Sequence, residues 1–174
     1  LYVNVGDYKN VWDELIRDIP QMRELATEHF DNWKDTKAFA TKALSASQIN
    51  NSDVVTDNNR DDNSKNITAD NSSEDTSDNI TGIHGFYHKN IFEAVYCTNL
   101  LMRSADVLVT KPSELAFYPV PKLFIKRVGG HEQWGAVHSA EIGDGTLECR
   151  DIPHTLQMIK LFMEDDTYII DMCK

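Results

Sequence analysis

Short apolar runs typical of β-strands alternate with helix-like segments along most of this 174-residue chain. The clearest strand is predicted at residues 106–110, and the clearest helices at 91–103 and 152–164. Strands that alternate with helices form parallel sheets, because parallel neighbours need long crossover connections. The sequence therefore predicts an α/β fold with a doubly wound, Rossmann-like parallel sheet. Ligands of such sheets bind beyond the carboxyl ends of the strands.

The other predicted elements continue the alternation. Further strands are predicted at residues 1–5, 83–88, 122–128 and 143–149, and further helices at 11–25 (divided near Pro20), 33–44, 131–142 and 167–172, with a short helix that opens at Ser113.

Residues 45–81 differ from the rest in composition. Asn, Asp and Ser dominate this segment, which has no aromatic residue and carries eight acidic and two basic side chains. Such a segment cannot bury enough apolar surface to offset the entropy lost on ordering. We therefore predict a disordered insertion at 45–81 within one α/β domain made of residues 1–44 and 82–174.

Charge and cysteine content exclude several classes of protein. A net charge of −11 argues against nucleic-acid binders that neutralise phosphates and against direct docking on anionic membranes. Three widely spaced cysteines indicate a reduced, cytoplasmic chain rather than a disulfide scaffold. No apolar run approaches the roughly 18 residues of a membrane span. Because the chain begins with Leu1 inside a strand-like run, we expect it to be a fragment of a longer protein.

Two strand ends carry the strongest signals for an anion site. Lys111, followed by Ser113 and Glu114, stands where a strand gives way to a helix, whose N-terminal N–H groups favour anions. The glycine pair Gly129-Gly130 lies between the next predicted strand and helix, where a ligand can approach the backbone closely. The alternatives are a capped helix with a surface lysine and a plain tight turn.

The histidine, cysteine and glycine patterns match no common catalytic or metal-binding motif. None of the six histidines forms an H-x-x-x-H pair in a helix or a Cys/His cluster, so we predict no metal site and structural roles for His84 and His88. No P-loop, G-x-S-x-G or G-x-G-x-x-G motif is present, and we predict no resident cofactor.

The region from Arg103 to Asp166 resembles the nucleotide-sugar-binding, C-terminal half of GT-B glycosyltransferases. The similarity is to the branch of monogalactosyldiacylglycerol synthases and murein-precursor N-acetylglucosaminyltransferases. It rests on the order and spacing of Ser104–Lys111, Glu114, Pro121, His131–Ala136 and Glu141–Gly145, with Gly85-Phe86-Tyr87 similar to a G-F-x segment of that branch and Gly6 at the end of its first strand. This chain departs from the branch in one place, since only Pro112 and Ser113 separate Lys111 from Glu114.

The resemblance implies a binding site for a uridine-diphosphate sugar. Glu114 would accept hydrogen bonds from the ribose hydroxyls, and the backbone near Phe86, Tyr87 and His88 would line the nucleobase pocket. The residues that would lie near the diphosphate and the sugar are Gly129, Gly130, His131 and Glu132, with Gly6, Lys111 and Ser113 completing the site.

The expected function is therefore donor binding in an inverting glycosyltransferase that transfers a hexose. The acceptor would be held by another domain or subunit, and the chain would reach a membrane only through that partner. Catalytic residues are not assigned. Two alternatives stay open: a non-catalytic GT-B-like interaction module, favoured by the short spacing between Lys111 and Glu114, and a UDP-sugar epimerase-like domain.

Overall fold

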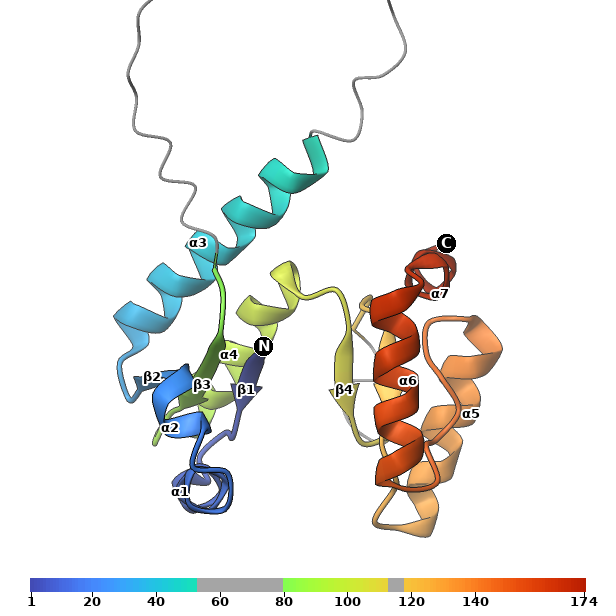
Figure 1. Ribbon diagram of the computed structural model, residues 1–174, viewed down its shortest axis with the longest axis horizontal. Helices are drawn as coiled ribbons and strands as arrows, with labels where there is room; N and C mark the ends of the chain where they lie inside the picture. Colours follow the sequence, from blue (N-terminus) through green and yellow to red (C-terminus); the bar gives the residue numbers. More distant parts are fainter. Residues whose placement is uncertain (53–79, 113–117) are drawn as a thin grey trace, which may run out of the picture. The chain divides into compact units, whose positions relative to one another are not determined.

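The computed structural model describes residues 1–52, 80–112 and 118–174. The chain forms two compact units, Leu1–Ser104 and Ala105–Lys174, each with its own parallel sheet and helices (Figure 1). The single domain that the sequence predicts stays a prediction. The short helix predicted at Ser113 and most of the predicted insertion lie outside the described residues.

The first unit contains a three-stranded parallel sheet in the order β1-β3-β2. Its strands are β1 (Tyr2–Asn4), β2 (Ala26–Phe30) and β3 (Ile83–Tyr87). In the central strand β3, Phe86 lies opposite Asn4 of β1 and His29 of β2. All three strands therefore end at the same edge of the sheet, as the alternating pattern predicts.

Helices connect these strands and cover them. The helical segments of the first unit are α1 (Lys9–Asp18), α2 (Met22–Leu25), α3 (Trp33–Ser52), α4 (Ile91–Leu101) and the 3₁₀ turn η1 (Met102–Ser104). The predicted division near Pro20 is confirmed, because α1 and α2 flank it. Helix α3 continues past its predicted end at residue 44, so the start of the predicted insertion is helical.

Both faces of β3 are covered. On one face Phe86 packs with Cys97 and Leu101, and partly buried Tyr2, Trp33 and Phe39 surround this core. On the other face the ring of Trp12, which is 1% exposed, lies directly against Gly85. The indole Nε1 of Trp12 donates a hydrogen bond to Glu28 at 2.8 Å. The central strand β3 is therefore covered by side chains on both faces.

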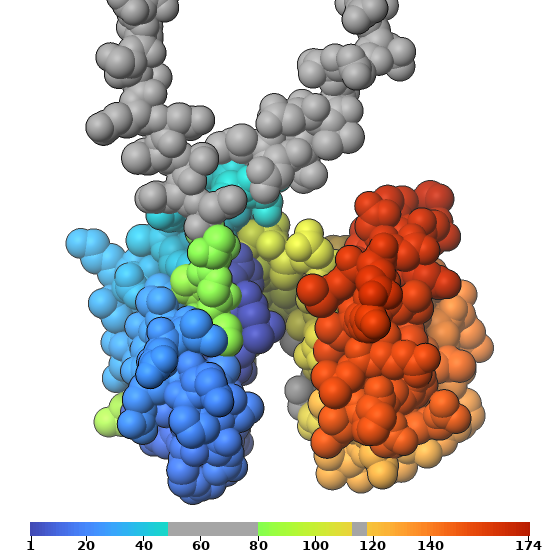
Figure 2. All heavy atoms as spheres, in the orientation of Figure 1, coloured from blue at the N-terminus to red at the C-terminus, as the bar shows by residue number. Residues whose placement is uncertain are grey.

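The second unit is built around two parallel strands, β4 (Leu108–Thr110) and β5 (Lys122–Phe124). Its helical segments are the 3₁₀ turn η2 (Gly130–Glu132), α5 (Gln133–Ile142), α6 (Ile152–Glu164) and α7 (Thr167–Met172). The core contains Leu123, Cys149 and Phe162. Helix α6 forms much of the visible face of this unit in the space-filling view (Figure 2).

The predicted fold class is confirmed at the level of an α/β protein with parallel strands. The described residues form sheets of three and two strands, and a single doubly wound sheet is not seen among them. The strand predicted at 143–149 is reduced to one parallel bridge between Gly145 and Lys122. Strand β2 was not predicted, because only His29 is buried in it and no alternating apolar pattern marks it.

Candidate functional site

The carboxyl ends of β1, β2 and β3 are joined by main-chain hydrogen bonds. The His88 N–H donates to the carbonyl of Gly6 at 3.1 Å, and the Asp31 N–H donates to the carbonyl of Tyr87 at 2.8 Å. Gly6, Asp31 and His88 each follow one of these strands, so three segments that are distant in sequence meet at one edge of the sheet.

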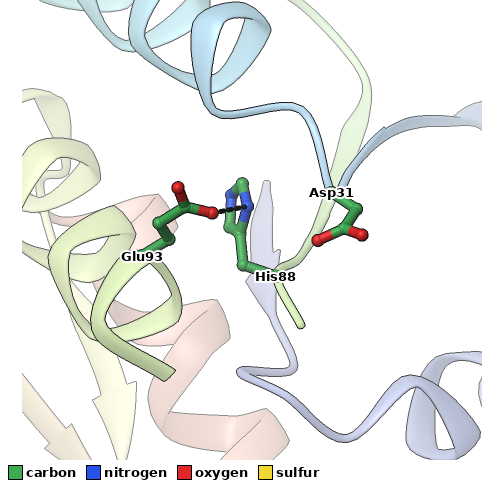
Figure 3. A group of neighbouring side chains, drawn as sticks. All are labelled: Asp31, His88 and Glu93. Atoms are coloured by element: carbon green, nitrogen blue, oxygen red, sulfur yellow. Dashed lines mark ion pairs between the residues drawn. The ribbon is translucent and has the colours of Figure 1, made fainter. Parts of the chain in front are cut away.

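Three side chains near this edge bring potential metal ligands together. Asp31 follows β2, His88 follows β3, and Glu93 lies in the first turn of α4. One ligand atom from each residue lies within 4.8 Å of the other two. In Figure 3 the imidazole of His88 stands between the carboxylates of Glu93 and Asp31.

His88 is fully buried, and one of its two ring nitrogens has a clear hydrogen-bond partner. Its Nε2 lies 3.0 Å from the hydroxyl of Thr36, which is also fully buried. Its Nδ1 is buried and has no hydrogen-bond partner among the described residues; the nearest carboxylate oxygen, on Glu93, is 3.8 Å away. Burial lowers the pKa of His88, and the carboxylates of Glu93 and Asp31 oppose that shift.

Asp31 is held in an uncommon backbone conformation. It is the one non-glycine residue with a positive φ, +49°, among the described ranges. Aspartate tolerates this left-handed region better than most residues. Its Oδ1 accepts a hydrogen bond from the N–H of Lys89 at 3.1 Å. This bond ties the loop after β2 to the loop after β3 and fixes the carboxylate at the edge of the sheet.

A second cluster of polar groups, which contains two buried histidines, lies in the same unit. Asp35 Oδ2 is 2.6 Å from His29 Nδ1, His29 Nε2 is 3.2 Å from His84 Nδ1, and His84 Nε2 is 3.1 Å from the carbonyl of Thr81. This hydrogen-bond network begins at a carboxylate oxygen of Asp35 and ends at the carbonyl oxygen of Thr81, and both oxygens are acceptors. Its three hydrogen bonds therefore need three protons, one more than two neutral imidazoles carry.

In the second unit, the predicted anion-binding residues lie near one another at the ends of β4 and β5. Lys111 Nζ lies 3.6 Å from Glu132 Oε1. The other carboxylate oxygen of Glu132 accepts hydrogen bonds from the N–H groups of Val128 at 2.7 Å and Gly129 at 3.2 Å. Glu132 is 5% exposed. Its carboxylate therefore holds the glycine loop in place beside Lys111.

Comparison with known proteins assigns this chain to one protein family. Two overlapping segments, residues 1–69 and 46–174, match the family model described as Domain of unknown function (DUF6938), and together they span the chain. The chain belongs to the DUF6938 family. No curated protein and no solved structure matches it.

The predicted site residues of this DUF6938 chain fall into two groups. In the first unit Gly6 and His88 are joined by a hydrogen bond, whereas the side chain of Phe86 is fully buried in the core and Tyr87 is half-buried. In the second unit Lys111 and Glu132 are in contact, and Gly129, Gly130 and His131 form the adjoining, more exposed loop. Ser113 and Glu114 lie outside the described residues.

Two polar residues of the first unit, Asp31 and Glu93, were missed by the sequence analysis. Asp31 was missed because β2, the strand that it follows, was not predicted. Glu93 lies three residues after Asn90, whose side chain accepts a hydrogen bond from the N–H of Phe92 at 3.0 Å and so caps α4. An Asn three residues before a Glu, just after a strand, was the one local signal that could have placed Glu93 at the sheet edge.

Among the described residues, no helix is both long and apolar enough to cross a membrane.

Proposed function

We propose that this chain is the donor-binding half of an inverting glycosyltransferase and that its second unit binds the diphosphate of a UDP-sugar. One observation carries the proposal: Lys111 and the Gly129-Gly130 loop, which follow neighbouring parallel strands, are held side by side through Glu132. A cation next to a glycine loop at the carboxyl ends of parallel strands is a suitable place for a diphosphate.

The contacts of Glu132 indicate how the loop would work. A carboxylate beside a diphosphate repels it unless the negative charge is compensated. Here Glu132 is buried, accepts two backbone hydrogen bonds and faces Lys111. We therefore assign Glu132 a positioning role, and assign the contacts with phosphate oxygens to Lys111, the exposed His131 and the backbone of Gly130.

The resemblance to GT-B glycosyltransferases supplies the rest of the proposal. It assigns the ribose hydroxyls to Glu114. The acceptor and the catalytic base would come from another domain or subunit, which would also bring the chain to a membrane. The finer fold proposal is a single doubly wound sheet.

Isothermal titration of the whole chain with UDP, UDP-glucose and UDP-N-acetylglucosamine tests donor binding. Replacing Lys111 by Gln removes a charged hydrogen-bond donor worth about 1.5–3 kcal/mol, so Kd should rise about ten- to a hundredfold. Glu114→Ala should weaken binding as well. The matched control is Lys160→Gln, since Lys160 is an exposed lysine of α6 that pairs with Glu164. Absence of heat with all three nucleotides in the millimolar range would refute the proposal.

One observation favours the interaction-module alternative. Val128 is 87% exposed and Trp134 is 71% exposed, and the two residues flank the glycine loop. A large exposed aromatic side chain of this kind is typical of a protein-contact surface. Copurification of a partner that is lost on Trp134→Ser, together with an absence of nucleotide binding, would support this alternative over donor binding. An epimerase-like domain would instead convert UDP-N-acetylglucosamine without an acceptor, which product analysis detects.

A further inference from the structure

We propose that Asp31, His88 and Glu93 form a binding site for a divalent transition-metal ion of the zinc and manganese type. The site lies wholly within the first unit and does not depend on nucleotide binding by the second. Three protein ligands from three separate segments would leave the remaining coordination positions of the ion open to water or to a substrate oxygen, as in catalytic zinc sites.

The strongest evidence is the state of the His88 ring. A polar atom buried without a hydrogen bond is costly, and most buried polar atoms in proteins are paired. The Nδ1 of His88 is buried without a hydrogen-bond partner among the described residues, and it lies 3.8 Å from a carboxylate oxygen of Glu93. A cation between the imidazole and the carboxylates would satisfy this atom.

The other ring nitrogen is arranged as in metal-binding histidines. Such histidines nearly always donate their second N–H to an oxygen atom, which fixes the tautomer and the orientation of the ring. The Nε2 of His88 is 3.0 Å from the Thr36 hydroxyl. With its proton on Nε2, the ring keeps the lone pair of Nδ1 available to a cation, and one carboxylate oxygen of Glu93 and one of Asp31 lie within 4.8 Å of this site's imidazole nitrogen. The rings of Trp33 and His88 form a T-shaped pair at a centroid distance of 5.6 Å, which limits the rotation of the imidazole.

The carboxylates can complete the site with a small movement. Around a tetrahedral ion with bonds near 2.1 Å, ligand atoms lie about 3.4 Å apart. The present separations are all within 4.8 Å, so the longest must shorten by at most about 1.4 Å. Glu93, whose side chain is 33% exposed, has the rotational freedom for this movement. Asp31 is anchored through Oδ1 to the Lys89 N–H, which leaves Oδ2 for the ion.

The donor set selects the class of ion. One imidazole nitrogen suits Zn²⁺ and other first-row transition metals, while two carboxylates suit Mn²⁺ as well. Mg²⁺ and Ca²⁺ prefer oxygen ligands and gain little from an imidazole. The pair of carboxylates also supplies the negative charge that balances a divalent cation. We therefore expect Zn²⁺ and Mn²⁺ to bind more tightly than Mg²⁺ or Ca²⁺.

Metal titration of the full chain tests the site. Isothermal titration with Zn²⁺ and Mn²⁺ is carried out in a Cys173→Ser background, because Cys173 is an exposed thiol that itself attracts Zn²⁺. Asp31→Asn and Glu93→Gln preserve the shape of each ligand and remove its charge. Asn also tolerates the positive φ of residue 31. Loss of an outer-shell partner alone weakens binding 10- to 100-fold, so loss of a ligand should raise Kd by at least about tenfold.

The control and a second measurement make the result unambiguous. Glu164→Gln removes an exposed carboxylate of α6 and should leave Kd unchanged. In ¹⁵N NMR spectra, one equivalent of Zn²⁺ should shift the Nδ1 resonance of His88 and leave Nε2 in its protonated form. The proposal is overturned if neither metal binds below about 1 mM, if both carboxylate variants bind like wild type, or if the His88 resonances do not move. Tighter binding of Mg²⁺ than of Zn²⁺ would also overturn it.

Discussion

Gly85 is the position at which a single methyl group should disturb the first unit most. A Cβ atom built on Gly85 would lie 2.4, 2.6 and 2.7 Å from three ring carbons of Trp12. Favourable carbon contacts are near 3.5–4.0 Å, so the indole would have to move by roughly 1 Å. That movement is resisted, because the ring is 1% exposed, packs edge-on against Phe30 and donates a hydrogen bond to Glu28 at 2.8 Å.

The expected cost of Gly85→Ala follows from these contacts. Overpacking a filled core costs about 1–3 kcal/mol. Weakening a hydrogen bond to a charged acceptor adds up to about 1.5–3 kcal/mol, and the lower entropy of the unfolded alanine chain returns about 0.4–1 kcal/mol. We expect the free energy of unfolding to fall by about 2–4 kcal/mol, a large share of the roughly 5–15 kcal/mol typical of a folded chain.

Urea denaturation followed by far-UV circular dichroism measures this loss. A suitable control is Gly130→Ala, since a Cβ at Gly130 meets nothing within 4 Å, and its effect should stay within about 0.5 kcal/mol. The clash itself is isolated by a double-mutant cycle with Trp12→Leu, in which Gly85→Ala should cost much less. If Gly85→Ala costs less than about 0.5 kcal/mol, or costs the same in the Trp12→Leu background as in the wild-type chain, the steric argument is wrong.

Two further predictions follow from buried titratable groups. Burial raises the pKa of Cys97 to about 12 and also raises the pKa of Cys149, so iodoacetamide at pH 8 should modify the exposed Cys173 first. Mass spectrometry of the peptides measures the three rates of modification. A Cys97 that reacts as fast as Cys173 would contradict this prediction. Burial, reinforced by the nearby charges of His29 and the N-terminus, lowers the pKa of His84 in the folded chain. As pH falls below about 6.5, the His84 imidazole therefore takes up a proton in the unfolded chain before it does so in the folded chain. The free energy of unfolding should therefore fall as pH falls below that value, by at most about 1.4 kcal/mol per pH unit from this residue. Urea midpoints measured between pH 7.5 and 5.5 should depend less on pH in His84→Asn than in the wild-type chain. An unchanged slope would show that His84 contributes nothing to this pH dependence.

Local patterns in the sequence were sufficient to predict most helices. Helices α6 and α7 begin and end where their apolar spacing predicts, at Ile152–Glu164 and Thr167–Met172. In α6 the side chain of Asp151 caps the first turn by accepting a hydrogen bond from the N–H of His154 at 2.9 Å. Such features depend on a few neighbouring residues. For that reason they can be read without knowledge of the fold.

Features that depend on pairing between distant segments were harder to predict. Strand β2 pairs with β3 along its length, yet its sequence, Ala26-Thr27-Glu28-His29-Phe30, has no alternation of apolar and polar residues. It is an edge strand with one buried side chain, so the sheet rather than its own composition makes it a strand. The segment at 122–128 shows the reverse case. It has strand-like composition, but β5 ends at Phe124.

The two candidate sites differ in how much of each was visible in the sequence, and the reason is topological. In the second unit the glycine loop and Glu132 are neighbours in sequence, and Lys111 ends the strand with the clearest pattern. In the first unit the register that places Phe30 opposite Tyr87 decides that the next residues, Asp31 and His88, lie side by side. A shift of one residue in that register would turn every side chain of β2 to the other face of the sheet and separate the two ligands. A metal site assembled across parallel strands therefore has no spacing signature, and it becomes detectable only once the pairing of the strands is known.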